Sequence, residues 1–348
     1  MQCKFTFSYY RLITVIFAFI ALILTSGCDK KSTEVKAEHP QPSGETTGVA
    51  GWPRTFETAK GPLTLTQPPK RIVSTSVTLS GTLLAINAPL IASGATGPNT
   101  DVADSRGFFI QWAKVAYERG VKLLYISEPN AEAVAAMVPD LIVISATGGD
   151  SAMKLYEQLS TIAPILVIDY GDKSWQQLAL QLGQITGNEA GAGEIIVRFE
   201  QRLQKVKQGI TLPPNPVSAF VYYADGRGVN LWTSSSAQGQ LLHQLGFTLA
   251  TLPTSLKTET SMGKREDIIQ LSAEGLADGL NGQSFMLFAT NDSTIQAVNA
   301  NPFLQHLPAV NTQRLYAMGP DTFRLDYYSA NNMLDRIEHY FSNQELKN

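Results

Sequence analysis

Cysteine and histidine are scarce in this chain. Its 348 residues include two cysteines, Cys3 and Cys28, and four histidines. Cys3 lies in a leader-like segment, so the processed chain would keep one cysteine and could form no internal disulfide. The histidines are scattered and lack the spacing of a zinc site, so we expect no transition-metal cluster. Stability must then come from an apolar core, which a chain of this length can bury.

Signatures of catalysis are also missing. The chain has no G-x-S-x-G nucleophile elbow and no H-E-x-x-H zinc motif. Gly263-Lys264 is followed by arginine rather than Ser or Thr and lacks the upstream glycine of a phosphate loop. The glycine-rich run ATGGD, residues 146–150, does not match a dinucleotide fingerprint. We therefore expect no enzyme and no cofactor. A secreted α/β hydrolase is kept as a remote alternative, which would need a nucleophile and a base within reach of each other.

The N-terminus has the pattern of an export signal. Two basic residues precede the apolar run Leu12–Leu24, which is too short for an ordinary membrane span. The run leads into LTSGC, which ends at Cys28 and resembles a bacterial lipobox, although a threonine stands where leucine is usual. We predict a lipoprotein signal peptide over residues 1–27 and acylation of Cys28, which would anchor the chain in a lipid bilayer. The alternative is an ordinary signal followed by an incidental cysteine.

A polar segment separates this signal from the rest of the chain. Residues 28–51 are rich in Gly, Pro, Ser and Thr and have no apolar period, which predicts a flexible tether. Removal of residues 1–27 takes away two basic and no acidic residues, so the formal net charge falls from −3 to −5. An acidic chain does not favour nucleic acid as a partner. Any cationic site must therefore be local.

From Trp52 onward, short apolar runs alternate with helical patterns. The runs RIVST, PLIAS, LLYIS, LIVIS and ILVID are separated by segments with helical spacing, which predicts parallel βαβ units. Apolar residues recur at three-and-four spacing over residues 188–210, and LPPNP ends that pattern. A second α/β unit follows. The sequence thus predicts two α/β lobes, 52–187 and 211–348, joined by one long helix over 188–210.

The stretch DTFRLDYYSA, residues 321–330, lies between the last predicted strand and the last predicted helix. It places Arg324 among Phe323, Tyr327 and other aromatic residues. One interpretation is a packed helix start in which Arg324 pairs with Asp321 or Asp326. The other is a surface that binds a flat, anionic ligand, because ligands of open parallel sheets bind beyond the carboxyl ends of the strands.

Other cations and aromatic residues occur in comparable loops. Arg106 lies in a long loop after PLIAS, and Arg227 lies in a loop after FVYYADG, shortly before Trp232. Lys264 and Arg265 belong to GKRED, just before an amphipathic helix that we predict within REDIIQLSAEGL. Arginine is suited to an anion site because it is always charged, planar and able to lie over aromatic rings. We expect these loops to face one cleft between the lobes.

The chain resembles the periplasmic binding proteins for ferric siderophores, the two-lobed class III proteins with a single rigid connecting helix. The resemblance covers residues 52–341, and within the family it is closest to the members that bind ferric enterobactin. Its specificity comes from many long segments rather than one short motif. They include PPKRIVSTSVTLSGTLLAI, EPNAEAVAAMVPDLIVISATGGDSA, LYEQLSTIAP, SAQGQLLHQLGFTLA, GKREDIIQL, NPFLQHLPAV and FRLDYYSA.

The resemblance implies capture of an iron(III)–catecholate siderophore in the periplasm. The ligand would pass to an inner-membrane ABC permease with its ATPase. Catecholate oxygens already coordinate the iron fully, so the protein would supply no metal ligand. The complex is anionic and ring-faced, so guanidinium, ammonium and aromatic groups would hold it. The ligand-binding residues that we predict are Arg265, Arg324, Trp232, Lys264, Tyr327, Arg227 and Arg106, the last two in loops that depart from the family pattern.

The resemblance also implies that one glutamate on each lobe docks to arginines of the importer. In the first lobe the pattern N-x-E followed by PDL points to Glu132, and in the second lobe the pattern R-E points to Glu266. The alternative interpretation is an exposed carboxylate at a helix start, stabilised by the helix dipole.

The expected location is the periplasm, with the protein tethered to the inner membrane. Asp29 directly follows the lipobox cysteine, which in similar lipoproteins goes with retention at the inner membrane. We expect a monomer. The alternative ligands are another iron chelate, a corrinoid or haem. Haem would need an axial His or Tyr, and of the predicted cleft residues Tyr327 alone could serve.

Overall fold

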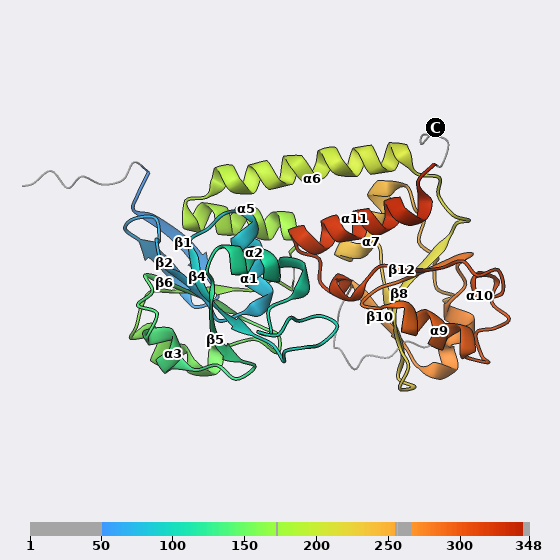
Figure 1. The fold of residues 1–348 in the computed structure, drawn as a ribbon, viewed down its shortest axis with the longest axis horizontal. Helices are drawn as coiled ribbons and strands as arrows, with labels where there is room; N and C mark the ends of the chain where they lie inside the picture. The colour runs from blue at the N-terminus through green and yellow to red at the C-terminus, as the bar shows by residue number, and fades with distance from the viewer. Residues whose placement is uncertain (1–50, 172, 255, 257–265, 344–348) are drawn as a thin grey trace, which may run out of the picture. The chain divides into compact units, whose positions relative to one another are not determined.

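The computed structural model describes residues 51–171, 173–254, 256 and 266–343. The predicted signal peptide and Cys28 lie outside these ranges, as do the cations Lys264 and Arg265. Within them, no helix combines the length and the apolar character that a membrane span requires. Figure 1 shows two groups of strands and helices, with the long helix α6 (Glu189–Gly209) running past both. The predicted fold class, two α/β lobes joined by one long helix, is confirmed.

The first lobe is built on a five-stranded sheet in the order β5-β4-β3-β6-β7, and every pairing in it is parallel. A hairpin of β1 (Arg54–Thr58) and β2 (Gly61–Leu65) precedes this sheet. Three of the sheet strands are buried along their whole length, as expected when helices cover both faces. The strands are β3 (Ile72–Ser74), β4 (Leu90–Ala95), β5 (Lys122–Ile126), β6 (Leu141–Ser145) and β7 (Ile165–Ile168). The helices are α1 (Val77–Ala85), α2 (Ile110–Glu118), α3 (Ala131–Ala135), η1 (Met153–Leu155), α4 (Tyr156–Ser160) and α5 (Trp175–Thr186).

The second lobe has a mixed sheet in the order β10-β9-β8-β11-β12. Strands β8, β11 and β12 are parallel, whereas β9 is antiparallel to both of its neighbours. The strands are β8 (Val217–Tyr223), β9 (Gly228–Trp232), β10 (Ile268–Leu271), β11 (Ser284–Leu287) and β12 (Leu315–Ala317). The helices are α7 (Ala237–Leu245), η2 (Ala273–Gly275), α8 (Leu276–Gly279), α9 (Asp292–Ala300), α10 (Pro308–Asn311), η3 (Pro320–Thr322) and α11 (Tyr327–Phe341).

One predicted element of this lobe is wrong. The segment REDIIQLSAEGL was expected to form a single amphipathic helix, but its central residues form strand β10. Ile268 and Leu271 are buried there, and β10 pairs antiparallel with β9. Two adjacent isoleucines favour an extended backbone. Hydrogen bonds to the edge of β9 stabilise that extended backbone as a strand. Helical structure is left to the short turns η2 and α8 that follow.

Helix α6 connects the lobes because one of its faces is apolar. The buried residues of that face recur at helical spacing, namely Ala192, Ile195, Phe199, Leu203 and Val206. On the first lobe, Phe199 meets Trp175 edge to face, with 5.1 Å between ring centroids. On the second lobe, Arg202 donates to Asn331 Oδ1 at 3.2 Å and forms an ion pair with Asp335, both on α11. Helices α5, α6 and α11 therefore pack as one group (Figure 1).

Candidate functional site

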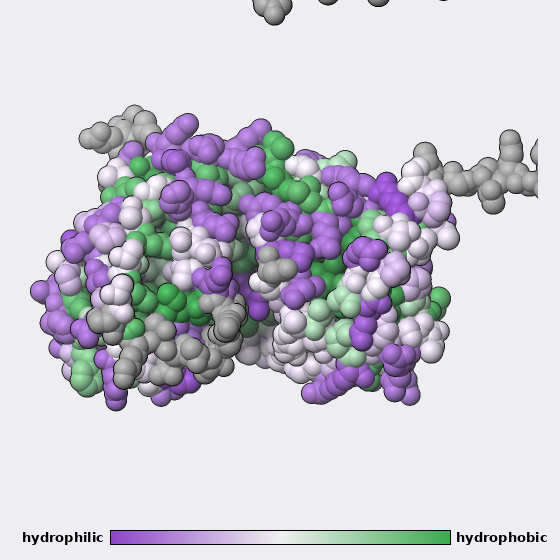
Figure 2. All heavy atoms as spheres, turned by 180° about the vertical axis from the view of Figure 1, so that it is seen from behind, coloured by the Kyte–Doolittle hydropathy of each residue, from purple (hydrophilic) through white to green (hydrophobic). Residues whose placement is uncertain are grey.

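Two adjoining cavities lie between the lobes, with volumes of about 700 Å³ and 460 Å³. Figure 2 shows the surface hollowed between the two halves of the molecule, with hydrophilic residues beside the hollow. The larger cavity includes Trp175 and Trp232, and the smaller one includes Tyr125 and Asp150. Six residues line both, which makes them the boundary between the cavities. They are Thr78, Phe109, Gln111 and Tyr170 from the first lobe, and Phe323 and Arg324 from the second.

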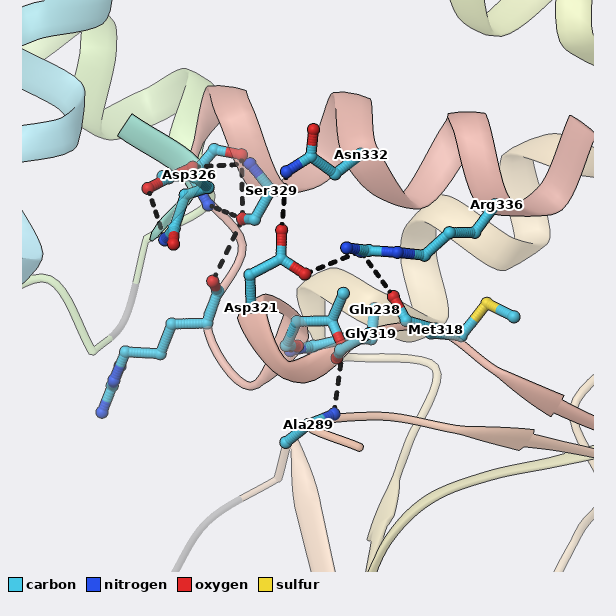
Figure 3. A network of polar contacts seen from close by, with 12 residues as sticks. Gln238, Ala289, Met318, Gly319, Asp321, Asp326, Ser329, Asn332 and Arg336 are labelled. Carbon is cyan, nitrogen blue, oxygen red and sulfur yellow. Dashed lines mark hydrogen bonds and ion pairs between the residues drawn. The ribbon is translucent and has the colours of Figure 1, made fainter. Parts of the chain in front are cut away.

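The loop that carries Arg324 is held at its start by hydrogen bonds to its backbone. The amide of buried Gln238 on α7 donates to the carbonyl oxygens of Thr322 and Phe323, at 3.0 and 2.8 Å. Thr322 Oγ1 accepts from the backbone N–H of Ala289 at 3.0 Å and donates to the carbonyl of Gly319 at 2.8 Å. Figure 3 shows these contacts clustered around the turn. They satisfy polar groups that would otherwise be buried without partners.

The two acidic residues near Arg324 are engaged elsewhere. Asp321 accepts from Arg336 Nη1 at 2.6 Å and from Asn332 Nδ2 at 2.7 Å, both on α11 (Figure 3). Asp326 caps α11 and accepts from the backbone N–H of Ser329 at 2.8 Å. The alternative that paired Arg324 with one of these aspartates is therefore wrong.

Arg324 instead reaches across to the first lobe. Its Cζ lies 4.5 Å from the ring centroid of Tyr170, which follows β7. Within the described residues, no carboxylate comes within ion-pair distance of this exposed guanidinium. A cation that borders two cavities and has a ring rather than an anion beside it can accept an anionic ligand without first breaking an ion pair.

Trp232 lines the larger cavity as part of its wall. It is 5% exposed and meets Phe323 and Phe288 edge to face, with centroid distances of 5.6 and 6.4 Å. Its indole N–H is buried, with no hydrogen-bond partner among the described residues. Buried donors normally have a partner, so a side-chain shift that exposed this N–H to the cavity would let it donate to a ligand acceptor.

Tyr327 occupies a different position. It is not among the residues that line either cavity. Its ring packs edge to face on Trp175, with 5.7 Å between centroids, and on Tyr328, with 5.4 Å. The structure therefore places Tyr327 in the contact between α11 and α5, and ligand binding by its side chain stays a prediction.

Arg106 and Arg227 already have carboxylate partners, and neither lines a cavity. Arg106 pairs with Asp104 at 3.0 Å, donates to the carbonyl of Ala113, and lies over the ring of Phe108. Arg227 lies in the loop after β8, as the sequence predicted, and that loop is the turn between β8 and β9, where Arg227 pairs with Asp225 at 2.7 Å. Both pairs are local, and their role in ligand binding stays a prediction.

The two predicted docking carboxylates are both exposed. Glu132 stands in the first turn of α3, whose N-cap Asn130 accepts from the backbone N–H of Ala133 at 3.0 Å. Glu266 lies two residues before β10 and belongs to the lining of the larger cavity. Both side chains are accessible to a partner.

Sequence reasoning missed the first-lobe side of the site. Tyr170, Gln111 and Phe109 line both cavities, yet none was singled out. A signal was available for Tyr170, because it follows the run ILVID at the carboxyl end of a predicted strand. Among the residues that the structure describes, no cluster of His, Cys, Asp and Glu could hold a metal ion.

Comparisons with known proteins agree with this geometry. Residues 72–322 match the family model described as periplasmic binding protein. The chain is 60% identical over 293 residues to the ferric enterobactin-binding periplasmic protein FepB of Escherichia coli O6:H1 (strain CFT073), covering 84% of this chain and 92% of that protein.

Solved structures show the same architecture. Holo-ViuP matches with a TM-score of 0.75 and 36% identity, over 84% of this chain and 97% of that one. The triscatecholate siderophore-binding protein FeuA of Bacillus subtilis, complexed with ferri-bacillibactin, has a TM-score of 0.59 and 18% identity, over 82% of this chain and 96% of its own, which shows the shared fold. The match to a binding-protein model, together with these relatives, confirms the expectation of a binding protein rather than an enzyme. This chain belongs to the periplasmic binding protein family.

Proposed function

We propose that this chain is the substrate-binding component of an ABC importer that captures a ferric catecholate siderophore of the enterobactin type in the periplasm. The observation that carries the proposal is Arg324, whose guanidinium lies between two cavities beside an aromatic ring, with no carboxylate of the described residues at ion-pair distance. The 60% identical relative, named for ferric enterobactin, supports the same ligand class. The ligand brings its own iron coordination, so the protein needs no metal ligand and no cofactor.

The chemistry of the cleft fits such a ligand. A ferric catecholate complex is anionic and presents flat rings, which arginine can approach by charge and by stacking. Trp175, Trp232 and Phe323 supply aromatic surface in the larger cavity. Charge pairs become stronger when lobes exclude water from a cleft, so one unpaired arginine contributes more there than on an open surface.

Our proposed contacts begin with Arg324 and Trp232, because both line the larger cavity. Lys264 and Arg265 are proposed from the family resemblance, and they precede the cavity-lining residue Glu266 in the sequence. Tyr327, Arg106 and Arg227 would need a different side-chain arrangement in the complex to reach a ligand in these cavities.

A tryptophan fluorescence titration tests the ligand class. Two of the four tryptophans line the larger cavity, so a bound iron chelate should quench emission. We expect ferric enterobactin to quench and a ferric hydroxamate to leave the signal unchanged. The reverse result would overturn the ligand class.

Charge removal tests the site itself. Arg324→Gln should weaken ferric enterobactin binding by about 2 kcal/mol or more, as expected for loss of a cation that is desolvated in the complex. The control is Lys114→Gln, which removes an exposed cation on α2 that pairs with Glu118 and lines neither cavity. If both variants bind like the wild type, Arg324 is not a ligand contact.

The importer contacts and the membrane anchor complete the proposal. Glu132 and Glu266 would meet arginines of the inner-membrane permease, so Glu132→Arg should reduce siderophore uptake by cells while leaving the affinity of the purified protein unchanged.

Acylated Cys28 would keep the protein at the inner membrane and raise its local concentration near the importer. Cys28→Ser should then move the protein from the membrane fraction to the soluble periplasmic fraction, and an unchanged distribution would overturn the anchor.

A further inference from the structure

Tyr170 meets Arg324 across the gap between the lobes. The tyrosine follows β7 in the first lobe, and the arginine belongs to the loop before α11 in the second. The guanidinium carbon lies 4.5 Å from the ring centroid, and both residues line both cavities. The ring is 7% exposed, whereas the arginine is exposed. A buried, fixed ring therefore supports a long and otherwise mobile side chain.

The ring of Tyr170 is fixed by the loop ATGGD, to which the sequence assigned no function. The phenol donates to Asp150 Oδ1 at 3.0 Å. The other carboxylate oxygen of Asp150 accepts from Ser76 Oγ at 2.5 Å and from the backbone N–H of Thr78 at 3.1 Å, at the start of α1. Asp150 thereby ties the ring to the start of α1.

Gly148 in the same loop makes room for the phenol. Its φ is +91°, and a Cβ at this position would lie 2.1 Å from the Tyr170 hydroxyl. A side chain there would be strained by the backbone conformation and would displace the ring. The glycine-rich run is thus explained by the seating of Tyr170 rather than by phosphate binding.

A neutral ring suits this position better than a carboxylate. A carboxylate beside Arg324 would compete with an anionic ligand for the same guanidinium. An aromatic face attracts the cation without neutralising it. Burial and the nearby Asp150 carboxylate raise the pKa of the Tyr170 phenol, which keeps the ring uncharged. The carboxylate orients the ring from its far edge and leaves the guanidinium available.

We infer that Tyr170, seated by Gly148 and Asp150, is a positioning residue that holds Arg324 between the two cavities for binding of an anion. The identity of that anion as a ferric catecholate rests on the proposed function. The contact itself is a property of the ligand-free protein. Binding is strengthened because less side-chain freedom of Arg324 has to be lost when the ligand arrives.

The first test measures ligand affinity of purified variants by fluorescence titration with ferric enterobactin. Tyr170→Leu removes the ring and should weaken binding about fivefold or more. Tyr170→Phe keeps the ring but loses the bond to Asp150, so its effect should be smaller. The control is Tyr156→Leu, which removes a half-buried first-lobe tyrosine that also has a cation over its ring, Lys60 at 5.2 Å, and lines neither cavity. An equal loss in the control would overturn a specific role for Tyr170.

The second test is a double-mutant cycle that separates positioning from general damage. In an Arg324→Gln background, Tyr170→Leu should have no further effect on affinity, because its effect acts through the arginine. Fully additive losses would overturn the inference.

The same cycle on the thermal stability of the ligand-free protein distinguishes this inference from the proposed function. A coupling between the two substitutions should appear without any ligand. Absence of coupling together with normal wild-type binding would overturn the positioning role alone. If the two substitutions are coupled but the wild-type protein does not bind ferric enterobactin, the positioning role is supported and the proposed ligand is overturned.

Discussion

The amide of Gln111 on α2 donates to the Asp326 carboxylate at the start of α11, with 3.2 Å between Nε2 and Oδ2. This bond joins the first lobe to the last helix of the chain. Asp326 is 9% exposed, and its other oxygen accepts from the backbone N–H of Ser329. Burial raises the pKa of this carboxyl, and the nearby charge of Asp321 acts in the same direction. The contact between the lobes thus contains a carboxylate that is costly to keep ionised.

The first prediction concerns the pH dependence of stability. A carboxyl whose pKa is raised by folding contributes stability below its ordinary pKa of about 4, and that contribution is lost as the pH rises through the folded value. Asp326→Asn has no charge to bury, and asparagine remains a good N-cap for α11. We therefore expect the variant to gain stability relative to the wild type as the pH increases from about 4 towards neutrality. Urea unfolding of both proteins across this range measures the difference.

The groups that face Asp326 decide how this result is interpreted. Gln111 and Ser329 donate hydrogen bonds that favour the ionised form, whereas burial and Asp321 favour the protonated form. A stability difference between Asp326→Asn and the wild type that stays constant with pH would show that the carboxyl titrates as it does in the unfolded chain. The direction of the predicted shift would then be wrong.

The second prediction concerns Gly81, where α1 meets the N-terminus of α11. A Cβ at Gly81 would lie 2.7 Å from Asp326 Oδ2 and 2.8 Å from the Trp112 ring, so alanine there must push the helices apart. We expect Gly81→Ala to destabilise the protein by about 1–3 kcal/mol, as overpacking usually does. Gly193→Ala on α6 is the control, because nothing lies within 4 Å of its added methyl group and alanine is the better helix former. Thermal unfolding of the two variants should therefore show shifts of opposite sign.

The architecture was predictable because its signals are local. Short apolar runs that alternate with segments of helical spacing indicate βαβ units, and this signal does not depend on which strands later pair. The long helix α6 has one apolar face, and the proline-rich segment LPPNP follows the end of the helix. The prediction for the segment before η2 was wrong because four residues, three of them apolar, fit a strand or a helix equally well, and pairing with β9 decides between the two. That pairing is a tertiary effect, which the sequence of the segment does not contain.

Sequence reasoning located the part of the site that belongs to the second lobe. Arg324 could be found because it stands at the junction of a strand and a helix. The position of Tyr170 at a strand end was also visible in the sequence, but its contact with Arg324 was not, because the two residues come from different lobes and meet through the packing of α11 on first-lobe helices. The sequence likewise gave no means of choosing a partner for Asp321, which binds Arg336 further along α11. Contacts between distant segments depend on how elements pack, and local patterns carry little of that information.

The third prediction concerns this ion pair between Asp321 and Arg336. The aspartate side chain is completely buried, and the arginine side chain is 28% exposed. Arg336→Met would leave a buried carboxylate with Asn332 as its remaining donor, so we expect a loss of about 3 kcal/mol in unfolding free energy. The double variant Asp321→Asn/Arg336→Met removes the stranded charge and should recover much of that loss.

A surface pair provides the comparison for this prediction. Arg198 and Glu194 form an exposed pair one turn apart on α6, with side-chain exposures of 59% and 67%. Arg198→Met should change stability by less than about 0.5 kcal/mol, as is usual for such pairs. Equal losses in the two arginine variants would contradict the importance that we assign to burial.

The fourth prediction concerns Gly319, which begins the turn that leads to Arg324. Its φ of +99° and ψ of +158° fall in a region that essentially only glycine occupies. A Cβ there would also lie 2.2 Å from the guanidinium carbon of Arg336, so a side chain would be strained and would break the ion pair with Asp321. We expect Gly319→Ala to cost more than about 3 kcal/mol in urea unfolding, the sum of backbone strain and a disturbed buried pair. Gly61→Ala separates these causes, because its φ of +98° is close to that of Gly319 but nothing lies within 4 Å of the added methyl group. That control should lose about 1–3 kcal/mol, the usual cost of the strained backbone alone. If both variants lose the same amount, the clash with Arg336 contributes nothing, and the glycine is required for its backbone conformation alone.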